Sequence, residues 1–364
     1  MPNLALGGAE RVMLTLAENF SLKGYHVEII VLNLDGSYLK SVPKNIEVIN
    51  LSSSRALFSL FSILKYLKSH KPDVMLSALG HINILAIIAK IFSRVKFRLV
   101  ISEHAIQSLL AKNSHKLREK IIPFFMWLLY RFSDHVIAVS NGVAESVLDT
   151  SSISPNKITT IYNPIIYEHQ IQHHNEVNIN SNFNNSNFKI IAVGRLSPEK
   201  DYYTLLKAFE VIKKSYNAHL LILGEGDERS KIESFIRSLN LTNYVTLLGF
   251  VEIPSAYIYK CDVLCLSSIS EGFGNVIVEA LAVGVPVVST NCPSGPSEIL
   301  KGGLWGELVQ VGDFLSMSRA IIKVINGKVV TPPINELIDL YGVENNTNSY
   351  LKVLTSKTEA PKNN

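Results

Sequence analysis

Two glutamates, Glu271 and Glu279, stand eight positions apart in the stretch SISEGFGNVIVEA. Gly272 and Gly274, in the loop between them, let the backbone approach a ligand closely, and a helix is predicted to begin near Asn275. N–H groups at a helix start attract an anion, while a carboxylate one turn further on can accept hydrogen bonds from vicinal hydroxyls such as those of a ribose. The spacing fits a site for phosphate and sugar, and it also fits an ordinary strand-to-helix turn with two solvated glutamates.

Two cations follow an earlier strand-like run, in the stretch VGRLSPEKD. Arg195 and Lys200 bracket a proline turn there, and two cations at the mouth of a cleft can neutralise a leaving diphosphate. The alternative is a solvated turn in which Asp201 is the N-cap of the next helix. Gly194 and Gly224 also stand in strand-end loops of this half of the chain. We expect the three loops to converge on one crevice, because ligands of such folds bind at the carboxyl ends of the strands.

The first half of the chain offers fewer residues of this kind. Gly7 and Gly8, in the stretch GGAER, are predicted to form a strand-to-helix turn, where backbone amides can contact a phosphate or an acceptor. His104, in VISEH, falls just past the end of a predicted strand, on the side that would face a second domain. A simple tight turn and a structural histidine are the alternatives at these positions.

Length and composition favour two folded domains. A chain of 364 residues is long for one domain and suits two, each able to bury its own core. No uncharged apolar run of about 18 residues occurs, and the N-terminus lacks the pattern of a secretory signal, so we expect a cytosolic protein. Cys261, Cys265 and Cys292 flank or occupy apolar runs with no histidine at zinc-ligand spacing, and we expect buried, reduced thiols there.

The charge is unevenly divided along the chain. The net charge is +4, but residues 1–165 carry 18 Lys and Arg against 11 Asp and Glu, whereas residues 166–364 carry 17 against 20. The basic first half could be steered to an anionic surface, such as the inner leaflet of a membrane, or to a substrate that carries a pyrophosphate. Nucleic acid is not favoured, because the cations are scattered and accompany no nucleic-acid motif.

Short β-branched runs alternate with longer amphipathic runs in both halves, which predicts an α/β fold. The strands are apolar along most of their length, as in parallel sheets that are covered on both faces. We therefore expect two doubly wound, Rossmann-like domains facing each other across a cleft. The expected divisions are an N-terminal domain over 1–167, an asparagine-rich linker over 168–187, a C-terminal domain over 188–330, and a helical segment with a disordered tail over 331–364.

The opening strand of the first domain is short. The first glycine turn follows the stretch MPNLAL, and six residues form a strand of at most about 20 Å. A doubly wound domain normally opens with a central strand, so we expect this strand to be incomplete and to be completed by residues encoded upstream of Met1.

Eight motifs, in this order, resemble one enzyme family. They are GGAER, SEH, AVSNGV, IYNP, VGRLSPEKD, LGEGD, EGFGNVIVEALAVGVPVV and CPSGPSEIL. The combination resembles the retaining glycosyltransferases of family 4, also called glycosyl transferases group 1, which have the GT-B fold. The resemblance covers nearly the whole chain outside the linker and the tail. Glu271 and Glu279 match the two glutamates of the family's E-x7-E signature.

The resemblance implies a role for each matched residue. Glu279 would bind the ribose of a nucleotide sugar, and Glu271 would lie against the donor sugar. Arg195 and Lys200 would hold the diphosphate and stabilise it as it leaves. His104 would contact the donor sugar and complete the catalytic set. The implied donor-binding set is Glu279, Gly272, Phe273, Gly274, Asn275, Gly194, Gly224 and Gly8.

The resemblance also implies the reaction. Enzymes of this family retain the anomeric configuration, the acceptor attacking on the face from which the diphosphate leaves, and they need neither a metal nor a cofactor. The donor is then a substrate, and we expect a UDP-sugar from which a hexosyl or N-acetylhexosaminyl group is transferred. The stretch CPSGPSEIL resembles members that build bacterial surface polysaccharides, lipopolysaccharide among them, which favours a saccharide acceptor linked to a lipid.

The first domain is expected to hold this acceptor. The run KLREKIIPFFMWLLYRF, over 116–132, sets a ten-residue apolar block among cations. The block is too short to span a bilayer but can lie at its interface, and the alternative is a helix buried in the domain core. Pro123 must fall near a helix start or a kink. We expect a cytoplasmic protein that makes peripheral contact with the inner face of the cytoplasmic membrane.

Other functions compete with this interpretation. A nucleotide-sugar epimerase or a phosphorylase can share the two-domain architecture, but no signature of either occurs. A dinucleotide dehydrogenase needs a G-x-G-x-x-G turn, which GGAER does not supply. A two-lobed binding protein could close on a sugar or nucleotide sugar without chemistry, but it would normally carry an export signal and would not need Arg195, Lys200 and Glu271 together.

Overall fold

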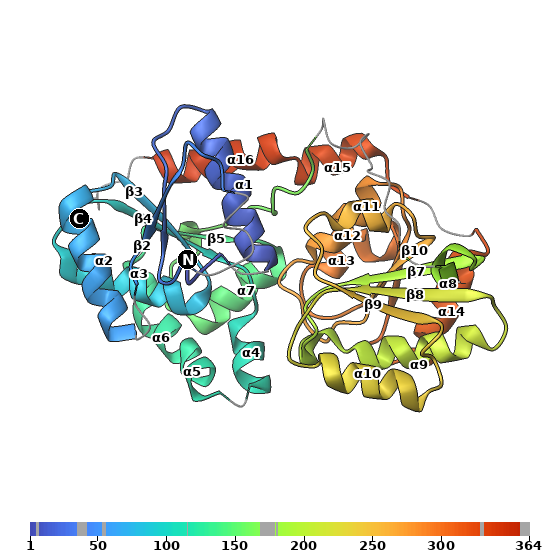
Figure 1. The fold of residues 1–364 in the computed structure, drawn as a ribbon. Helices are drawn as coiled ribbons and strands as arrows, with labels where there is room; N and C mark the ends of the chain where they lie inside the picture. The colour runs from blue at the N-terminus through green and yellow to red at the C-terminus, as the bar shows by residue number, and fades with distance from the viewer. Residues whose placement is uncertain are drawn as a thin grey trace. The chain divides into compact units, whose positions relative to one another are not determined.

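The chain folds into two compact units in a computed structural model (Figure 1). Unit 1 comprises Met1–Pro164 and Val343–Asn364, and unit 2 comprises Ile165–Gly342. The structure describes residues 1–4, 7–34, 42–52, 56–114, 116–167, 179, 181–327 and 331–356.

Unit 1 is an α/β unit whose strands all pair in parallel. The strands are β1 (Glu28–Val31), β2 (Glu47–Asn50), β3 (Val74–Ala78), β4 (Arg98–Glu103), β5 (His135–Ala138) and β6 (Ile158–Thr160). The helices are α1 (Gly8–Leu22), α2 (Ala56–His70), α3 (Gly80–Ser93), α4 (Gln107–Asn113), α5 (Leu117–Lys120), α6 (Ile122–Leu129), α7 (Asn141–Thr150) and α16 (Val343–Thr355), with the 3-10 turns η2 (Tyr130–Phe132) and η3 (Pro155–Lys157). Within this unit α1 and α16 lie together on one face of the strands, and α3 and α6 lie on the other (Figure 1).

The sheet of unit 1 is in two parts, since β1 pairs with β2 and the sheet β3-β4-β5-β6 is separate. A cavity of about 240 Å³ is lined by residues of both β1 and β3 and by α1, α2 and α16. The amino group of Met1 donates to the carbonyl of Ile30 at 2.8 Å, and burial lowers the pKa of this amino group to about 6. Residues 1–4 form no strand, and the expectation that upstream residues complete one stays a prediction.

Unit 2 is a doubly wound parallel sheet in the order β12-β11-β10-β7-β8-β9. Its strands are β7 (Phe188–Val193), β8 (Ala218–Leu223), β9 (Val245–Gly249), β10 (Val263–Leu266), β11 (Val287–Thr290) and β12 (Glu307–Val309). Its helices are α8 (Ser181–Asn184), α9 (Tyr202–Lys213), α10 (Arg229–Ser238), α11 (Pro254–Ile258), α12 (Asn275–Ala282), α13 (Pro296–Ile299), α14 (Phe314–Ile325) and α15 (Ile334–Tyr341), with the 3-10 turns η5 (Pro198–Lys200) and η6 (Lys301–Gly303).

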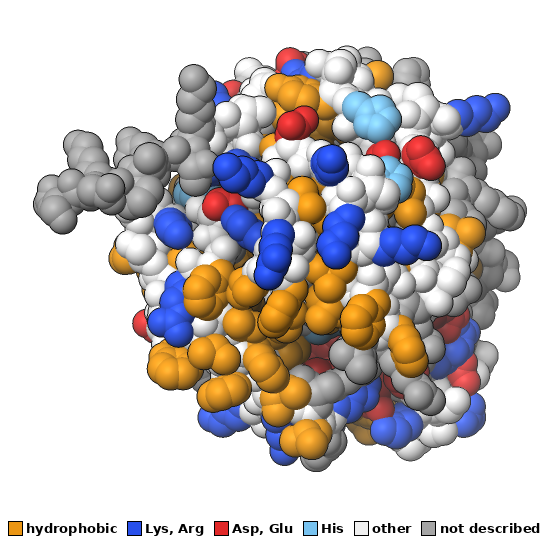
Figure 2. Space-filling model, turned by 90° about the vertical axis from the view of Figure 1, so that its left-hand side faces the viewer, with side chains coloured by type: hydrophobic (Ala, Val, Ile, Leu, Met, Phe, Trp, Pro, Cys, Tyr) orange, Lys and Arg blue, Asp and Glu red, His pale blue; other side chains and the backbone are white. Residues whose placement is uncertain are grey.

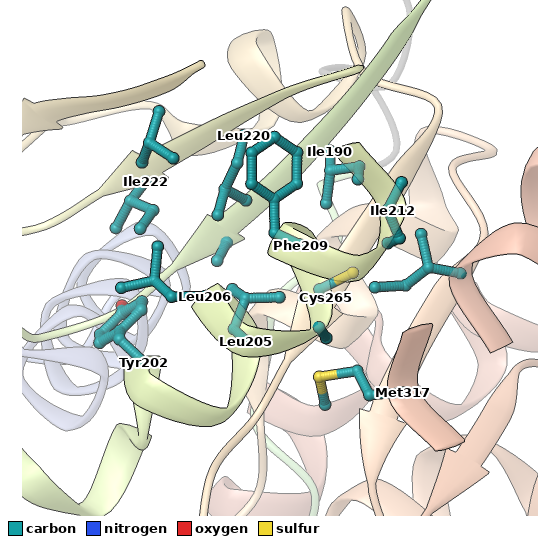
Figure 3. Packing of buried hydrophobic residues seen from close by; sticks show 14 of the residues in the cluster. Ile190, Tyr202, Leu205, Leu206, Phe209, Ile212, Leu220, Ile222, Cys265 and Met317 are labelled. Carbon is teal, nitrogen blue, oxygen red and sulfur yellow. The ribbon is translucent and has the colours of Figure 1, made fainter. Parts of the chain in front are cut away.

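The strands of unit 2 are apolar along most of their length because they lie in the core of the unit. Every residue of β8, β10 and β11 is buried, because helices cover the sheet. Leu205 and Phe209 of α9 pack with Leu220 of β8 and Met317 of α14 (Figure 3). The three cysteines are buried thiols, as predicted.

Several expected boundaries can be compared with the described residues. Residues 168–178 and 180 of the expected linker lie outside them, and residues 181–184 form α8, whose Phe183 is buried. The expected segment 331–364 divides between the units, α15 lying in unit 2 and α16 in unit 1, while its last residues, 357–364, lie outside the described part.

The run over 116–132 is helical, but it does not form one continuous helix. The described residues form α5, α6 and the turn η2 instead. Pro123 lies in the first turn of α6, as predicted, where a missing N–H leaves no hydrogen bond unmade. The proline therefore starts a new helix rather than kinking a long one.

Candidate active site

The strand order of unit 2 alone predicts where a ligand crevice lies in this unit. The chain moves from β7 outward to β8 and β9, and then returns to place β10 on the other side of β7. In a doubly wound sheet, ligands bind at the carboxyl ends of the strands where the order reverses. The loops that follow β7 and β10 carry Gly194 and Arg195 on one side and Ser268 and Glu271 on the other.

The two loops meet through an ion pair. Nζ of Lys200 lies 2.5 Å from Oε1 of Glu271, and their side chains are only 19% and 11% exposed. The hydroxyl of Ser268 donates to the same carboxylate oxygen at 2.6 Å. The hydroxyl of Ser267 donates to the carbonyl of Lys200 at 2.8 Å, which ties the two loops together a second time. The structure thus brings together two of the residues predicted to act on the donor.

Gly194 and Gly224 stand at the ends of neighbouring strands, where two loops approach each other closely. Gly224 has φ +139°, and a Cβ there would lie 1.9 Å from the carbonyl oxygen of Gly194. That same oxygen accepts a hydrogen bond from the hydroxyl of Tyr202 at 2.9 Å. Glycine at position 224 therefore lets the loops after β7 and β8 approach each other closely.

The loop after β10 turns into α12 through a left-handed residue. Gly274 is the N-cap with φ +102°, and Asn275 is the first helical residue, as predicted. Glu279 lies about one turn into the helix and is 9% exposed. Phe273 is buried, with its ring edge-on to Tyr341 at 5.7 Å. This packing fixes the backbone at Gly274, from which the first N–H groups of α12 project.

The charge of Glu271 acts on its buried neighbours. Burial raises the pKa of Tyr202 well above its ordinary range, and the carboxylates of Glu271 and Glu199 raise it further. Burial raises the pKa of Cys292 to about 12, with Glu271 as the second cause. Arg195, in contrast, is exposed at the end of β7. The tyrosine and the cysteine therefore stay neutral at pH 7 beside the ion pair of Lys200 and Glu271.

Asp201, the alternative to a site at this turn, also has its predicted role. Its side chain accepts from the N–H of Thr204 as the N-cap of α9. An N-cap at Asp201 and an ion pair at Lys200 occur together, so the two interpretations do not exclude each other.

The remaining two predicted residues belong to unit 1. His104 follows β4 directly, and its Nε2 lies 3.0 Å from the hydroxyl oxygen of Ser102. Burial lowers the pKa of His104 to about 4, so the imidazole is neutral at pH 7. Gly8 is the first residue of α1, after Gly7 as the N-cap.

A buried residue that none of the motifs singles out stands directly before this histidine. Glu103 is fully buried and accepts from Nδ2 of Asn83 at 2.7 Å, from Nε2 of Gln107 at 3.0 Å and from the hydroxyl of Tyr130. Burial raises its pKa, while these donors oppose the rise. The signal was an acidic residue inside an apolar strand, where only a hydrogen-bonded carboxyl is tolerated. The network holds the strand end that carries His104.

The residues that the structure describes hold neither a cluster of metal ligands nor a helix that could span a membrane. There, no three His, Cys, Asp or Glu side chains gather in a way that could hold a metal ion. No helix in that part of the chain is long and apolar enough to cross a bilayer.

Comparison with known proteins identifies the family. The model described as Glycosyltransferase Family 4 matches residues 6–169, and the one described as Glycosyl transferases group 1 matches residues 175–336. A relative from Campylobacter jejuni, named N-acetylgalactosamine-N,N'-diacetylbacillosaminyl-diphospho-undecaprenol 4-alpha-N-acetylgalactosaminyltransferase, is 33% identical over 88% of this chain and 87% of its own length. The amylovoran biosynthesis glycosyltransferase AmsD of Erwinia amylovora is 25% identical over 81% of this chain and 80% of its own.

Solved structures agree on the fold. HepE from Anabaena, solved in complex with UDP and glucose, superposes with a TM-score of 0.78 at 21% identity and covers 96% of both chains. The predicted α/β fold with two Rossmann-like domains is confirmed. The chain belongs to the glycosyl transferases group 1, the glycosyltransferases with the GT-B fold that its motifs resemble.

Proposed function

We propose that this glycosyltransferase moves a hexosyl or N-acetylhexosaminyl group from a UDP-sugar to a saccharide linked to a lipid, with retention of configuration. The observation that carries the donor half is the largely buried ion pair of Lys200 and Glu271 at the switch point of the unit 2 sheet. A charge pair is costly to bury, so its presence at a ligand crevice favours a functional role.

Each residue of the donor site has a task in this proposal. Lys200 and Arg195 hold the diphosphate and stabilise the negative charge that grows on it as the sugar leaves. Glu271 orients the donor sugar together with the amides of Gly272 and Gly274. Glu279, at the start of α12, accepts hydrogen bonds from the ribose hydroxyls.

The reaction needs no protein nucleophile in this scheme. The acceptor hydroxyl attacks the anomeric carbon on the face from which the diphosphate departs, and its proton passes to a leaving phosphate oxygen. His104, neutral at pH 7, can accept or donate a hydrogen bond at a sugar hydroxyl, depending on its tautomer. We further propose that no metal takes part, since Lys200 and Arg195 supply the positive charge.

The donor base and the acceptor follow from the comparisons by analogy. HepE was solved with UDP and glucose, which supports a UDP-sugar donor. The Campylobacter relative is named for an acceptor on diphospho-undecaprenol, and the Erwinia relative for amylovoran biosynthesis. We therefore place this chain in the assembly of a bacterial surface polysaccharide, at the cytoplasmic side of the inner membrane and in peripheral contact with it.

A ligand panel tests the donor half. We expect UDP and one UDP-sugar, but neither GDP nor ADP, to raise the melting temperature without added metal, because a ligand of the folded state stabilises it by mass action. Glu279→Gln should remove most of the shift, whereas Glu233→Gln, on the surface helix α10, should keep it. A melting temperature unmoved by every nucleotide would contradict the donor assignment.

Product analysis tests the rest. With the UDP-sugar found in the panel and a saccharide diphospho-lipid acceptor, we expect a product whose new linkage keeps the donor's anomeric configuration by NMR. Arg195→Ala should lower turnover about tenfold or more, as one charged contact to the leaving group is lost. Binding of the nucleotide sugar without transfer to any acceptor would instead favour a nucleotide-sugar binding protein. Inversion of a stereocentre in the donor sugar itself would favour an epimerase.

A further inference from the structure

Three neighbouring helices of unit 1 carry large aromatic side chains that face solvent. Phe58 and Phe61 of α2 are 58% and 62% exposed, Phe92 of α3 is 66% exposed, and Phe124 and Trp127 of α6 are 58% and 54% exposed. α3 packs against both α2 and α6. We call these five residues the aromatic face. A monomeric protein rarely leaves so many large apolar groups exposed on adjacent helices without a partner.

Exposed cations lie on α2 and in the segments next to α3 and α6. On α2, Phe58 and Phe61 are followed at helical spacing by Lys65 and Lys68, so that one exposed stripe changes from aromatic to basic. Figure 2, which looks onto the side of unit 1 that carries α2, shows apolar side chains gathered beneath a row of Lys and Arg. We call Lys65, Lys68, Arg94, Lys96, Lys120 and Arg131, all of them exposed, the basic rim.

The stripe on α6 has cations at both ends. Lys120, Phe124, Trp127 and Arg131 follow one another at spacings of four, three and four residues, along the nearly continuous helical run of α5, α6 and η2. The rings of Phe124 and Trp127 lie 6.2 Å apart. Segments that lie at a membrane interface typically combine aromatic side chains, which insert into the bilayer, with long cationic side chains. The aliphatic stems of these cations lie along the apolar surface, and their charged ends reach the lipid headgroups.

The charges on these helices distinguish between possible binding partners of the aromatic face. The stretches that form α2, α3 and α6 contain no Asp or Glu. A second copy of the chain would bring the same cations against the same face with no carboxylate on these helices to pair with them. A bilayer that contains anionic lipids satisfies both features, because its headgroups pair with the basic rim and its acyl boundary takes up the aromatic face.

We propose that the aromatic face and the basic rim together form the surface by which this chain lies on an anionic membrane. The inference deepens the proposed function and rests on it for the identity of the acceptor, which a peripheral enzyme would meet at the bilayer surface. It extends the contact expected at 116–132 to α2 and α3, which the sequence analysis did not include.

Vesicle sedimentation tests the surface without donor or acceptor. The chain should bind vesicles made of equal parts phosphatidylglycerol and phosphatidylcholine. It should bind vesicles of phosphatidylcholine alone at least tenfold more weakly. Binding should also fall steeply at about 1 M salt, where charges are screened beyond about 3 Å. Lys65→Ala with Lys68→Ala should weaken binding about 30-fold, a factor of about five for each cation near an anionic surface.

Aromatic variants test the other half of the surface. Phe61→Ser and Phe92→Ser should each weaken vesicle binding about tenfold, since half-inserted rings lose their apolar contact. Both side chains are exposed, so the fold should survive, which the melting curve checks. Matched controls are Leu22→Ser, 74% exposed on α1, and Lys214→Ala, 70% exposed in unit 2, and both should bind as the unchanged chain does.

Two results would overturn the proposal. One is the absence of binding to the phosphatidylglycerol vesicles, or equal losses in the matched controls. The other is a dimer in sedimentation velocity that Phe61→Ser dissociates while vesicle binding is missing, which would make this face a contact between copies. UDP-induced stabilisation, measured on the same samples, separates this test from the proposed function, because Lys200 and Glu279, which are proposed to bind UDP, lie in unit 2 and the vesicle surface lies in unit 1.

Discussion

Removal of the charge of Lys200 is the sharpest test of the donor site. Its Nζ lies 2.5 Å from Glu271 Oε1 in a pair that is only 19% and 11% exposed. Lys200→Met keeps the apolar stem and removes the charge, so the carboxylate of Glu271 keeps the hydroxyl of Ser268 but loses its cation. The variant should therefore lose both stability and catalysis.

The two losses differ in size. An exposed ion pair contributes less than about 1 kcal/mol, and loss of one partner of a fully buried pair costs about 3–5 kcal/mol. At the observed burial we expect about 2 kcal/mol, which lowers the melting temperature of unit 2 by about 4–8 °C. Turnover should fall about 100-fold or more, since one charged donor to a developing anion contributes about 2.7–4 kcal/mol to the transition state.

Calorimetry and steady-state kinetics with the UDP-sugar identified by the panel measure the two losses separately. Lys231→Met is the matched control, because Lys231 pairs with Glu228 at 2.6 Å in the same unit but is 70% exposed. It should change neither quantity. A Lys200→Met variant that melts earlier as expected, yet turns over within threefold of the unchanged enzyme, would show that the pair is structural and refute the reasoning.

Three further predictions concern the supports of the site. Gly224→Ala should destabilise unit 2 by about 2 kcal/mol or more in urea unfolding, because φ +139° is strained for alanine and its Cβ would overlap the Gly194 carbonyl. Tyr130→Phe should cost unit 1 about 1–3 kcal/mol in the same assay, since buried Glu103 loses a donor. Burial lowers the pKa of His104 to about 4, so the unfolded chain binds the extra proton between that pH and about 6.5. The stability that neutral His104 contributes is therefore full above pH 6.5 and lost as the pH falls towards 4, by up to about 3 kcal/mol, and His104→Asn should flatten this part of the stability profile.

The glycine and tyrosine predictions each have a control in the chain. Gly302→Ala lies in open space at φ +65° and should cost less than Gly224→Ala, and Tyr203→Phe, whose hydroxyl contacts the carboxylate of Glu228 near the surface, should cost less than Tyr130→Phe. Equal effects in either comparison, or a pH profile unchanged by His104→Asn, would contradict the packing described above.

Much of the fold could be predicted because each strand or helix has a recognisable pattern in its own stretch of sequence. The apolar runs of β8, β10 and β11 are buried on both faces, so periodicity alone identified a parallel sheet. The split of 116–132 into shorter helices could not be predicted with the same certainty, since a proline in an apolar run fits either a kink or a new helix start. The division of the last helices between the two units depends on tertiary packing, which a segment's own pattern does not encode.

Some residues of the candidate site could likewise be predicted from the sequence, and others could not. Lys200 and Glu271 could be predicted to share one crevice, because each follows a parallel strand and such strand ends share an edge of the sheet. The three donors to Glu103 come from Asn83, Gln107 and Tyr130, scattered over 48 positions of sequence, and no local pattern brings them together. Hydrogen-bond networks of this kind are visible only once the helices are packed.

The divided sheet of unit 1 has a consequence for how the chain melts. Strands β1 and β2 are only partly buried and a cavity of about 240 Å³ borders β1 and β3, whereas every residue of β8 is buried. Unit 1 should then open first on warming, with amide hydrogens of β1 and β2 exchanging before those of β7 and β8. Sugar transfer and nucleotide binding would fail at different temperatures, and a heated sample could take up UDP normally after it has stopped making product.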